Sequence, residues 1–381
     1  MEFDLTWILV GLPVAFALGW IASRLDLRQL RIANRQAPRA YFKGLNYLLN
    51  EQQDQAIDAF IEAVQNDPDT SELHFALGNL FRRRGEYDRA VRVHEHLLSR
   101  GDLGTADRQR AQHGLALDFL KAGLLDRAED ALRKLEGSPF EGQARLARLA
   151  IYERSREWPQ AAEVAALLER SGEANFSVRQ AHYLCEQARE AHARGDSAQA
   201  IQILGQALKL APEAPRARIL LGQLWLHQSQ PQQAFETLAP LFENGDSAAL
   251  LACNSLVKAA QAAGLQQQAR ELLQRHYTRQ PSIDTLDALG QLEAQGDRQT
   301  RDRYLQHLQG HPSLIATARW LGAAQDPATL PAPVHKALEQ AVRPLSRYRC
   351  AACGFEAREH FWHCPGCQAW DSYPPRRIEE L

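Results

Sequence analysis

Residues 44–68 read GLNYLLNEQQDQAIDAFIEAVQNDP, and residues 78–98 read GNLFRRRGEYDRAVRVHEHLL. The two stretches align at a spacing of 34 residues, which separates Gly44 from Gly78 and Ala56 from Ala90. A pair of antiparallel helices of this size has an apolar face too small to stand alone, so neighbouring pairs must stack. Glycine or alanine where two helices cross lets their axes approach closely. The period therefore predicts a solenoid of helix pairs.

This pattern is typical of tetratricopeptide repeats, and it continues along most of the chain. The alanines that mark the second helix of each unit are Ala56, Ala90, Ala128, Ala161, Ala200, Ala234 and Ala269. We predict an all-α tetratricopeptide (TPR) solenoid over residues 37–325, with seven repeats and a degenerate eighth that begins at Gly290 and serves as a cap. The alternative is a generic helical bundle, which would not require steps of 34 residues.

A solenoid of this kind binds segments of partner proteins on its concave face, which the first helix of each unit lines. From the repeat phasing we expect a partner-binding groove formed by Phe75, Asn79, Arg82, Arg189, His192, Gln223, Asn254, Lys258 and Gln261. The alternative is that these residues belong to solvated helix faces. The sequence has no phosphate-binding glycine loop, G-x-S-x-G or H-E-x-x-H, and such motifs accompany catalysis. We therefore expect a protein that is not an enzyme.

An apolar segment lies near the amino terminus. Residues 5–23, LTWILVGLPVAFALGWIAS, carry no charge, and as a helix they would reach about 28 Å, close to the hydrocarbon thickness of a bilayer. We predict a short periplasmic terminus and a single transmembrane helix within residues 1–23. A cleavable signal peptide fits poorly because acidic Glu2 and Asp4 precede the segment. A buried core helix is the remaining alternative.

Residues 24–36 form a basic juxtamembrane segment, in which Arg24, Arg28, Arg31 and Arg35 recur at helical spacing. By the positive-inside rule, this segment and the bulk of the chain lie on the cytoplasmic side of the inner membrane. The stripe could contact anionic membrane lipid, or it could be a plain stop-transfer flank. The whole chain has 44 basic and 46 acidic residues and a net charge of −2, so no overall field favours nucleic acid.

Four of the six cysteines lie in residues 348–370, YRCAACGFEAREHFWHCPGCQAW. Two Cys-x-x-Cys turns that face each other make a tetrahedral site of four sulfurs. We predict a single iron or zinc ion bound by Cys350, Cys353, Cys364 and Cys367. Both metals suit four thiolates, and two separate redox dithiols are the alternative. The predicted metal-binding domain, residues 347–381, is too small for a core of its own, and a metal commonly supplies the missing stability.

Residues 326–346 are expected to form a linker with one short helix. The domain that follows is dense in aromatic residues, which either shield the sulfurs or dock the domain onto the solenoid: Phe355, Phe361, Trp362, Trp370 and Tyr373. His360 and His363 are not needed as ligands. Cys185 and Cys253 are expected to be small residues of the helical scaffold. Because only these two cysteines lie outside the cluster, the chain has no disulfide framework, which indicates a reducing compartment.

The spanning helix, the repeat array and the terminal YRCAACGF…WHCPGCQAW together resemble the lipopolysaccharide assembly protein B family of Gram-negative bacteria. The resemblance covers essentially the whole chain. It implies that the four cysteines form a rubredoxin-like site, although the spacing between the two Cys-x-x-Cys pairs is much shorter than in full-length rubredoxins.

The resemblance also implies partners. Members of the family act as inner-membrane adaptors that promote degradation of the LpxC deacetylase by the protease FtsH, and a LapC-type inner-membrane regulator restrains them. The motifs do not fix which groove residues would bind these partners. Two other functions stay open: electron transfer by a rubredoxin-like iron, and nucleic-acid binding by a zinc ribbon, although we expect no nucleic-acid partner. A homo-oligomer is also consistent with the sequence.

Overall fold

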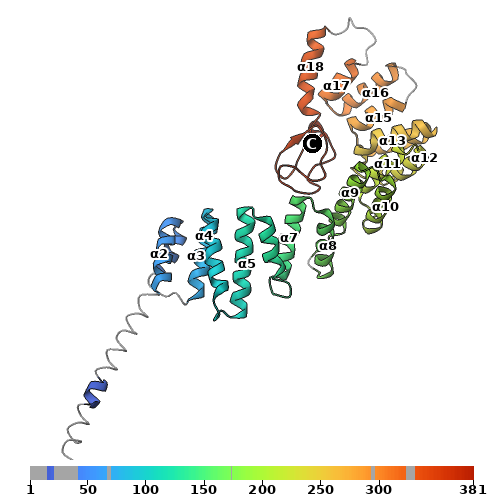
Figure 1. Ribbon diagram of the computed structural model, residues 1–381. Helices are drawn as coiled ribbons and strands as arrows, with labels where there is room; N and C mark the ends of the chain where they lie inside the picture. The colour runs from blue at the N-terminus through green and yellow to red at the C-terminus, as the bar shows by residue number, and fades with distance from the viewer. Residues whose placement is uncertain (1–14, 21–41, 67–69, 173, 293–296, 323–330) are drawn as a thin grey trace, which may run out of the picture. The chain divides into compact units, whose positions relative to one another are not determined.

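The computed structural model describes residues 15–20, 42–66, 70–172, 174–292, 297–322 and 331–381. The chain divides into two compact units, residues 1–151 and 152–381, and each is described by itself. Both are built from antiparallel helices (Figure 1). The small metal-binding module at the carboxyl terminus, residues 347–381, belongs to the second unit.

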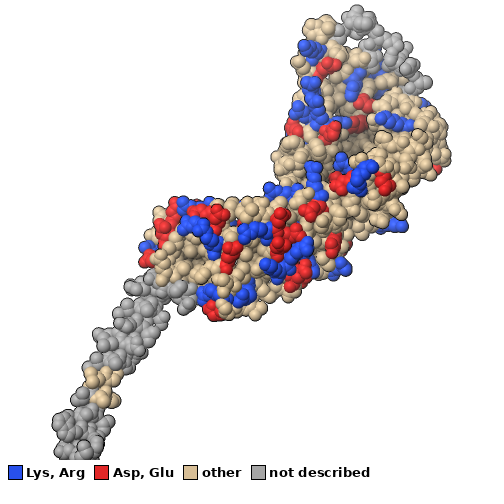
Figure 2. Space-filling model, in the orientation of Figure 1, with Lys and Arg blue, Asp and Glu red and all other residues tan. Residues whose placement is uncertain are grey.

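In the first unit, the helical stretch 15–20 is followed among the described residues by a helix over residues 42–49. It continues with α2 (Gln53–Asn66), α3 (Ser71–Arg84), α4 (Tyr87–Ser99), α5 (Thr105–Ala122), α6 (Leu125–Arg133) and most of α7 (Glu141–Ser155). Helix α4 packs on both α3 and α5, as a repeat array requires. Acidic and basic side chains alternate over the face of these helices seen in Figure 2, so this face has no single sign of charge.

The second unit contains the end of α7 and a longer run of helices. These are α8 (Trp158–Arg170), α9 (Ser177–Ala193), α10 (Ser197–Leu210), α11 (Pro215–His227), α12 (Pro231–Glu243), α13 (Ala249–Ala263), α14 (Gln266–Arg279), α15 (Ile283–Leu292), α16 (Asp297–Gly310), α17 (Leu314–Gly322) and α18 (Ala332–Leu345). The largest apolar core of this unit lies among α11–α15. Helix α16 supplies the second helix of the degenerate eighth repeat, which the sequence did not signal.

The predicted repeat phase is confirmed by burial. Each alanine assigned to the second helix of a repeat is completely buried, at 0% exposure: Ala56, Ala90, Ala128, Ala161, Ala200, Ala234 and Ala269. A larger side chain at these places would separate helices that pack in direct contact. The all-α TPR solenoid predicted from the 34-residue period is therefore the observed fold.

Glycines mark the closest helix crossings. A Cβ atom added to Gly222 of α11 would lie 2.6 Å from Leu238 of α12, and one added to Gly78 of α3 would lie 2.6 Å from His94 of α4. Real Cβ atoms do not approach side chains this closely. Only glycine therefore lets these helix pairs keep their spacing.

The metal-binding module contains little regular structure. Strands β1 (Tyr348–Arg349) and β2 (Glu356–Ala357) pair antiparallel on either side of the first Cys-x-x-Cys turn. A bridge between His363 and Trp370 closes the second turn in the same way, and a short 3-10 helix, η2 (Ile378–Glu380), ends the module. The predicted linker holds α18, which at 14 residues is longer than expected.

No helix within the described residues is long and apolar enough to cross a membrane. The predicted spanning segment, residues 5–23, lies outside the described residues except for the helical stretch 15–20. The basic juxtamembrane segment, residues 24–36, lies outside them entirely. The spanning helix and the basic segment therefore remain predictions from the sequence.

The substitution Gly222→Ala should destabilise the protein by about 1–3 kcal/mol, because the added methyl group overlaps Leu238. Gly205→Ala is the matched control, since a Cβ on Gly205 of α10 meets no atom within 4 Å. That change should stabilise the protein by about 0.4–1 kcal/mol through helix propensity. Urea unfolding of both variants measures the difference, and equal effects would contradict the close crossing.

Candidate metal centre and its docking surface

The four predicted cysteines meet at one point. All four Sγ atoms lie within 4.8 Å of one another, and two of the separations are 3.8 Å (Cys350 to Cys367) and 3.7 Å (Cys353 to Cys364). Metal–sulfur bonds of about 2.3 Å in tetrahedral geometry place the sulfurs about 3.8 Å apart. A disulfide would need about 2.05 Å. The cluster therefore fits one tetrahedral metal ion and no disulfide.

Each Cys-x-x-Cys turn is closed by its own backbone. Cys350 donates its N–H to the carbonyl of Phe355, and Cys364 does the same to Ala369, both at 2.9 Å. The residue after the first turn, Gly354, has a φ of +78°, and the residue after the second, Gln368, has a φ of +60°. Glycine adopts this left-handed conformation freely, which explains Gly354. Gln368 is held there by the hydrogen bond from its N–H to the carbonyl of Cys364 (2.8 Å).

The site stabilises the thiolate of one cysteine, but its four sulfurs lie so close together that they disfavour negative charge on another. Burial alone would raise the pKa of Cys350, but hydrogen bonds from the Ser372 hydroxyl and from backbone amides outweigh it and lower the pKa to about 6. At Cys353 the amide of Phe355 lowers the pKa, whereas desolvation and the neighbouring sulfurs raise it more, to about 12. Four thiolates this close repel one another, and a bound cation removes that repulsion.

Cys350 and Cys364 are buried, whereas Cys353 and Cys367 are exposed. The inner pair packs with Tyr348 and Tyr373 in a small apolar cluster. Leu251 of α13 contacts this cluster from outside the module. The buried side of the metal centre therefore faces the solenoid.

Trp370 forms the main contact between the module and the helices. Its indole N–H donates to the carboxylate of Glu153 at 3.1 Å. Its ring stacks on His182 with centroids 4.9 Å apart, and it meets the edges of Tyr183 and Trp158 at 5.8 and 6.1 Å. One module residue therefore touches three helices, α7, α8 and α9.

Glu153 is only 7% exposed, and its carboxylate gathers several donors. The guanidinium of Arg179 makes two contacts to it at 2.8 Å, and the hydroxyl of Tyr183 donates to it as well. Burial, and then this hydrogen bond, raises the pKa of Tyr183, so Tyr183 remains a donor. Next to Trp370, Asp371 contacts His182 through its carboxylate at 2.9 Å.

The two roles considered for the aromatic residues are divided among them: Trp370 and Trp362 contact the helices, and Tyr373 packs beside the sulfurs of Cys350 and Cys364. Glu153, His182 and Asp371 complete the contact, but no motif in the sequence marks them. A lone glutamate or histidine within a repeat carries no periodic signal. The only available clue was the density of aromatic residues in the partner module.

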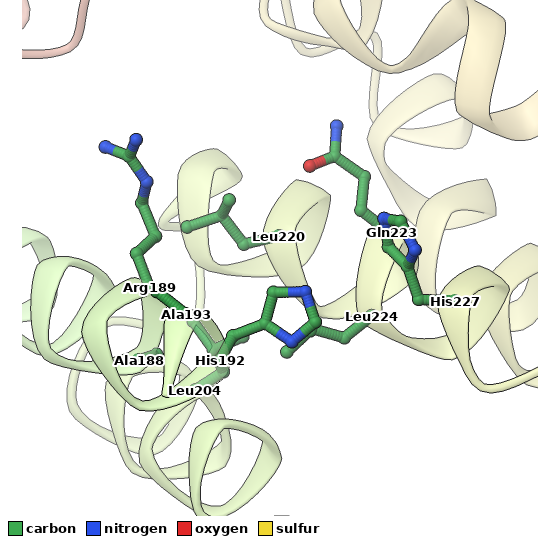
Figure 3. Close-up of a pocket in the computed structure, with 9 residues that line it drawn as sticks. All are labelled: Ala188, Arg189, His192, Ala193, Leu204, Leu220, Gln223, Leu224 and His227. Carbon is green, nitrogen blue, oxygen red and sulfur yellow. The ribbon is translucent and has the colours of Figure 1, made fainter. Parts of the chain in front are cut away.

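Three of the predicted groove residues lie around one pocket. Arg189 and His192 of α9 and Gln223 of α11 line a space of about 230 Å³, whose walls include Leu204, Leu220 and Leu224. Figure 3 shows the side chains of Arg189 and Gln223 extending to the same side, with Leu220 between them. Asn254, Lys258 and Gln261 are exposed on α13 but do not line this pocket.

The residues predicted for the first unit are placed differently. Phe75 is 2% exposed and packs with Leu97 and Ala111, so it is not an open groove position as expected. Helix α3 turns this side chain toward α4 and α5. Arg82 bonds to Asn79 and to the buried carboxylate of Asp118, an ion pair inside the repeat stack.

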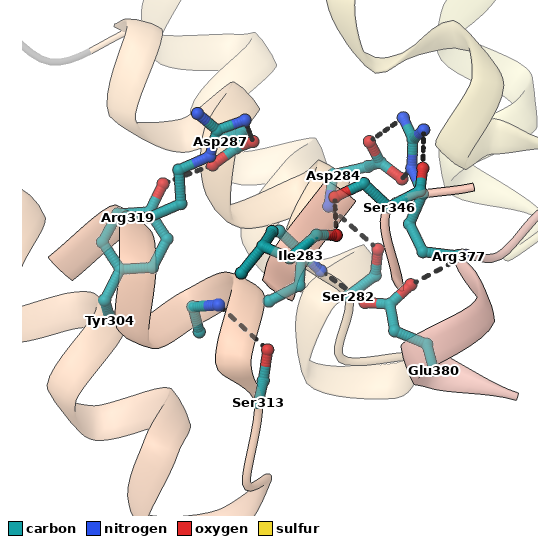
Figure 4. A network of polar contacts seen from close by, with 12 residues as sticks. Ser282, Ile283, Asp284, Asp287, Tyr304, Ser313, Arg319, Ser346, Arg377 and Glu380 are labelled. Carbon is teal, nitrogen blue, oxygen red and sulfur yellow. Dashed lines mark hydrogen bonds and ion pairs between the residues drawn. The ribbon is translucent and has the colours of Figure 1, made fainter. Parts of the chain in front are cut away.

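The last residues of the chain fasten the module to the end of the solenoid (Figure 4). Arg377 makes a two-pronged contact with Asp284 of α15 at 2.8 and 3.0 Å, and it lies 4.4 Å over the ring of Tyr348. Glu380 accepts the N–H of Ile283 at 2.7 Å. Glu379 accepts the N–H of Leu314 at 2.5 Å and the hydroxyl of Ser313 at 2.6 Å. The two acids therefore cap the amino ends of α15 and α17.

These features define the class of protein: a TPR solenoid that carries a four-cysteine metal module docked on its helices. A family described as a rubredoxin metal binding domain matches residues 348–374, and tetratricopeptide repeat families match residues 73–109 and 191–253.

Two proteins called "Lipopolysaccharide assembly protein B" match nearly the whole chain. The one from Escherichia coli K12 is 32% identical over 380 residues, which is 96% of this chain and 97% of the relative. The one from Haemophilus influenzae is 29% identical over 395 residues, which is 97% of this chain and 98% of the relative. The chain belongs to the lipopolysaccharide assembly protein B family.

The substitution Cys364→Ser should abolish stable metal binding, because it removes one of four ligands from the buried side of the site. Cys253→Ser is the control, since Cys253 is also buried but belongs to α13 and is not one of the four clustered cysteines. Metal content per chain, measured by mass spectrometry of the purified protein, should fall close to zero only in the first variant. Full metal occupancy in Cys364→Ser would refute the assignment.

The substitution Trp370→Ala should loosen the module without removing its metal. Trp370 is partly buried, so its loss should cost less than the roughly 3–5 kcal/mol of a fully buried tryptophan, and amide exchange at the module–helix contact should accelerate by about tenfold or more. Phe355→Ala is the control, because Phe355 is an exposed aromatic residue of the same module. Unchanged exchange in Trp370→Ala would show that other contacts hold the module.

Proposed function

We propose that this protein is a non-enzymatic adaptor in lipopolysaccharide assembly, anchored in the inner membrane with its bulk in the cytoplasm. Membership of the lipopolysaccharide assembly protein B family supports the biological role. The apolar segment 5–23 and the arginines that follow it support the anchor and its orientation. In the finer proposal the adaptor brings the LpxC deacetylase to the protease FtsH, and a LapC-type regulator acts near the membrane.

The observation that carries the adaptor role is the pocket between α9 and α11. Its leucine walls suit an apolar side chain of a partner segment, and Arg189, Gln223 and two histidines at its rim offer polar contacts. Pockets with apolar walls and a few polar groups at the rim are typical of binding sites. Helix α9 also carries His182 and Tyr183, which hold the module, so one helix connects the metal centre to the pocket.

In this proposal the metal is structural. The ion would be held by the four cysteines, and its chemical contribution is to cross-link two turns that lack a core. The chain's own residues hold the module on the solenoid. Trp370 fixes it on α7–α9, and the tail fixes it on α15 and α17. A partner would meet the solenoid and the module as one rigid surface.

The test of the adaptor role replaces Arg189 by Glu and Gln223 by Ala together. In cells whose only copy carries these changes, LpxC should persist several-fold longer in a pulse–chase experiment, because the partner segment loses its polar contacts. Arg275→Glu is the control, since Arg275 is exposed on α14 and outside the pocket. If complete loss of the protein left the half-life of LpxC unchanged, the proposed role in proteolysis would be wrong.

Electron transfer is the second candidate, because Cys353 and Cys367 are exposed at the surface of the module. An iron centre so close to solvent could exchange electrons with a docked partner. Exchange of the metal for zinc separates the two functions, since zinc has no redox chemistry. A zinc-loaded protein that fully supports LpxC turnover would support the adaptor and exclude a redox requirement.

A further inference from the structure

A second cavity lies away from the pocket on α9 and α11, and the proposed function does not use it. It has a volume of about 760 Å³ and lies among α17, α18 and the metal module. Four arginines line it: Arg319 from α17, Arg343 from α18, Arg347 just after α18 and Arg358 just after β2. Figure 2 shows several basic side chains over α17 and α18, with acidic side chains between them.

The positive charge of this cavity is poorly compensated. Among the residues that the structure describes, Glu339 is the only acidic one that lines it, and it lies 3.6 Å from His335. Arg319 reaches Asp287 only at 3.4 Å. Arg347 reaches Glu356 at 3.8 Å, while Arg349 holds the same carboxylate more closely, at 2.8 Å.

The other two arginines have no such partner. Arg343 and Arg358 are exposed, and no carboxylate in the described part of the chain lies within ion-pair distance of either one. Guanidinium groups from four segments around one cavity repel one another unless an anion lies between them. The whole chain has a net charge of −2, so this local excess of positive charge is not a general property of the protein.

Apolar side chains from α17 and α18 form another part of the lining, beside the polar residues His335, Glu339 and Ser346. Ile315 and Ala318 of α17 face the cavity from one side, and Leu338 and Val342 of α18 face it from the other. Val342 also packs against the core around Ile283 and Tyr304, which fixes the carboxyl half of α18 in place. The cavity thus has a rigid apolar wall and a cationic rim, and its volume lies in the range of small-molecule sites, about 300–1,000 Å³.

The geometry points to a binding site for a phosphorylated small molecule in this cavity. Arginine suits a phosphoryl group because its planar fork donates two parallel hydrogen bonds to two oxygens. Arg343 and Arg358 bind the phosphoryl group directly, and Arg319 and Arg347 add positive charge. The apolar wall accepts an uncharged part of the ligand. The phosphoryl group belongs either to a lipid head group or to a water-soluble compound.

The ligand would tie together the parts that it touches. Arg319 belongs to the end of the solenoid, Arg343 to the connecting helix, and Arg358 to the metal module. A bound phosphoryl group therefore stabilises the same arrangement that the tail stabilises through Arg377 and Glu379. Binding should accordingly slow amide exchange in α18.

The first experiment titrates the full-length protein, held in nanodiscs of zwitterionic phosphatidylcholine, which has no net charge, with inorganic pyrophosphate in a calorimeter. Saturable binding at one site per chain is expected. The double variant Arg343→Gln, Arg358→Gln should bind at least tenfold more weakly, with affinity that depends less on salt. The matched control Arg194→Gln, Arg275→Gln removes the same charge from exposed positions outside the cavity and should bind within twofold of the original.

Absence of saturable binding to the unmodified protein would overturn the proposal. An equal loss in both double variants would also overturn it, because attraction by overall charge would then explain the binding. Thermal unfolding of the variants checks that they fold. All four substituted arginines are exposed, so no loss of stability is expected.

The second experiment distinguishes the two sources of the phosphoryl group. Glycerol 3-phosphate and dihexanoyl phosphatidic acid carry the same head group, but only the latter has apolar chains. Tighter binding of the phosphatidic acid, reduced selectively by Leu338→Asn, would assign the site to a phosphorylated lipid. Equal affinities, unaffected by Leu338→Asn, would assign it to a water-soluble phosphate compound.

Discussion

A buried carboxylate connects the two structural parts of the second unit. Glu153 lies inside the helix stack, where an unpaired charge would cost several kcal/mol (about 3–5 when one partner of a buried pair is removed). Arg179 and Tyr183 satisfy part of its hydrogen-bonding capacity from α9, and the indole of Trp370 satisfies another part from the metal module. The module therefore supplies part of the hydrogen bonding of a charge that is buried in the helix stack.

The metal and this contact support each other. The module has two strands of two residues each and cannot position Trp370 by its own core, so the four sulfurs must hold its turns. These turns then position Trp370 and Asp371, which lie three and four residues after Cys367. At the other end, the tail places Arg377 and Glu380 on α15. The module is thus fixed at two separate places on the solenoid.

The repeat array could be predicted because its physical cause is local and periodic. Ala200 or Gly222 must be small wherever two helices cross, and this requirement recurs along the sequence at a fixed interval. The metal ligands were equally accessible, since two Cys-x-x-Cys turns imply a shared ion from their spacing alone. By contrast, the placement of Phe75 depends on how far α3 is rotated about its axis, which the period does not determine. The partners of Trp370 depend on a tertiary contact between segments far apart in sequence, and no local pattern encodes such a contact.

Glu153 and Trp370 are separated by 217 residues. Neighbouring repeats contact each other soon after each leaves the ribosome, so the array can assemble in the order of its synthesis. Trp370, however, is made about 10–40 s after Glu153 at ordinary rates of translation. During this interval the docking site on α7–α9 has been synthesised, but Trp370, which binds there, has not. Binding of the metal ion therefore comes after synthesis of the helices on which the module docks.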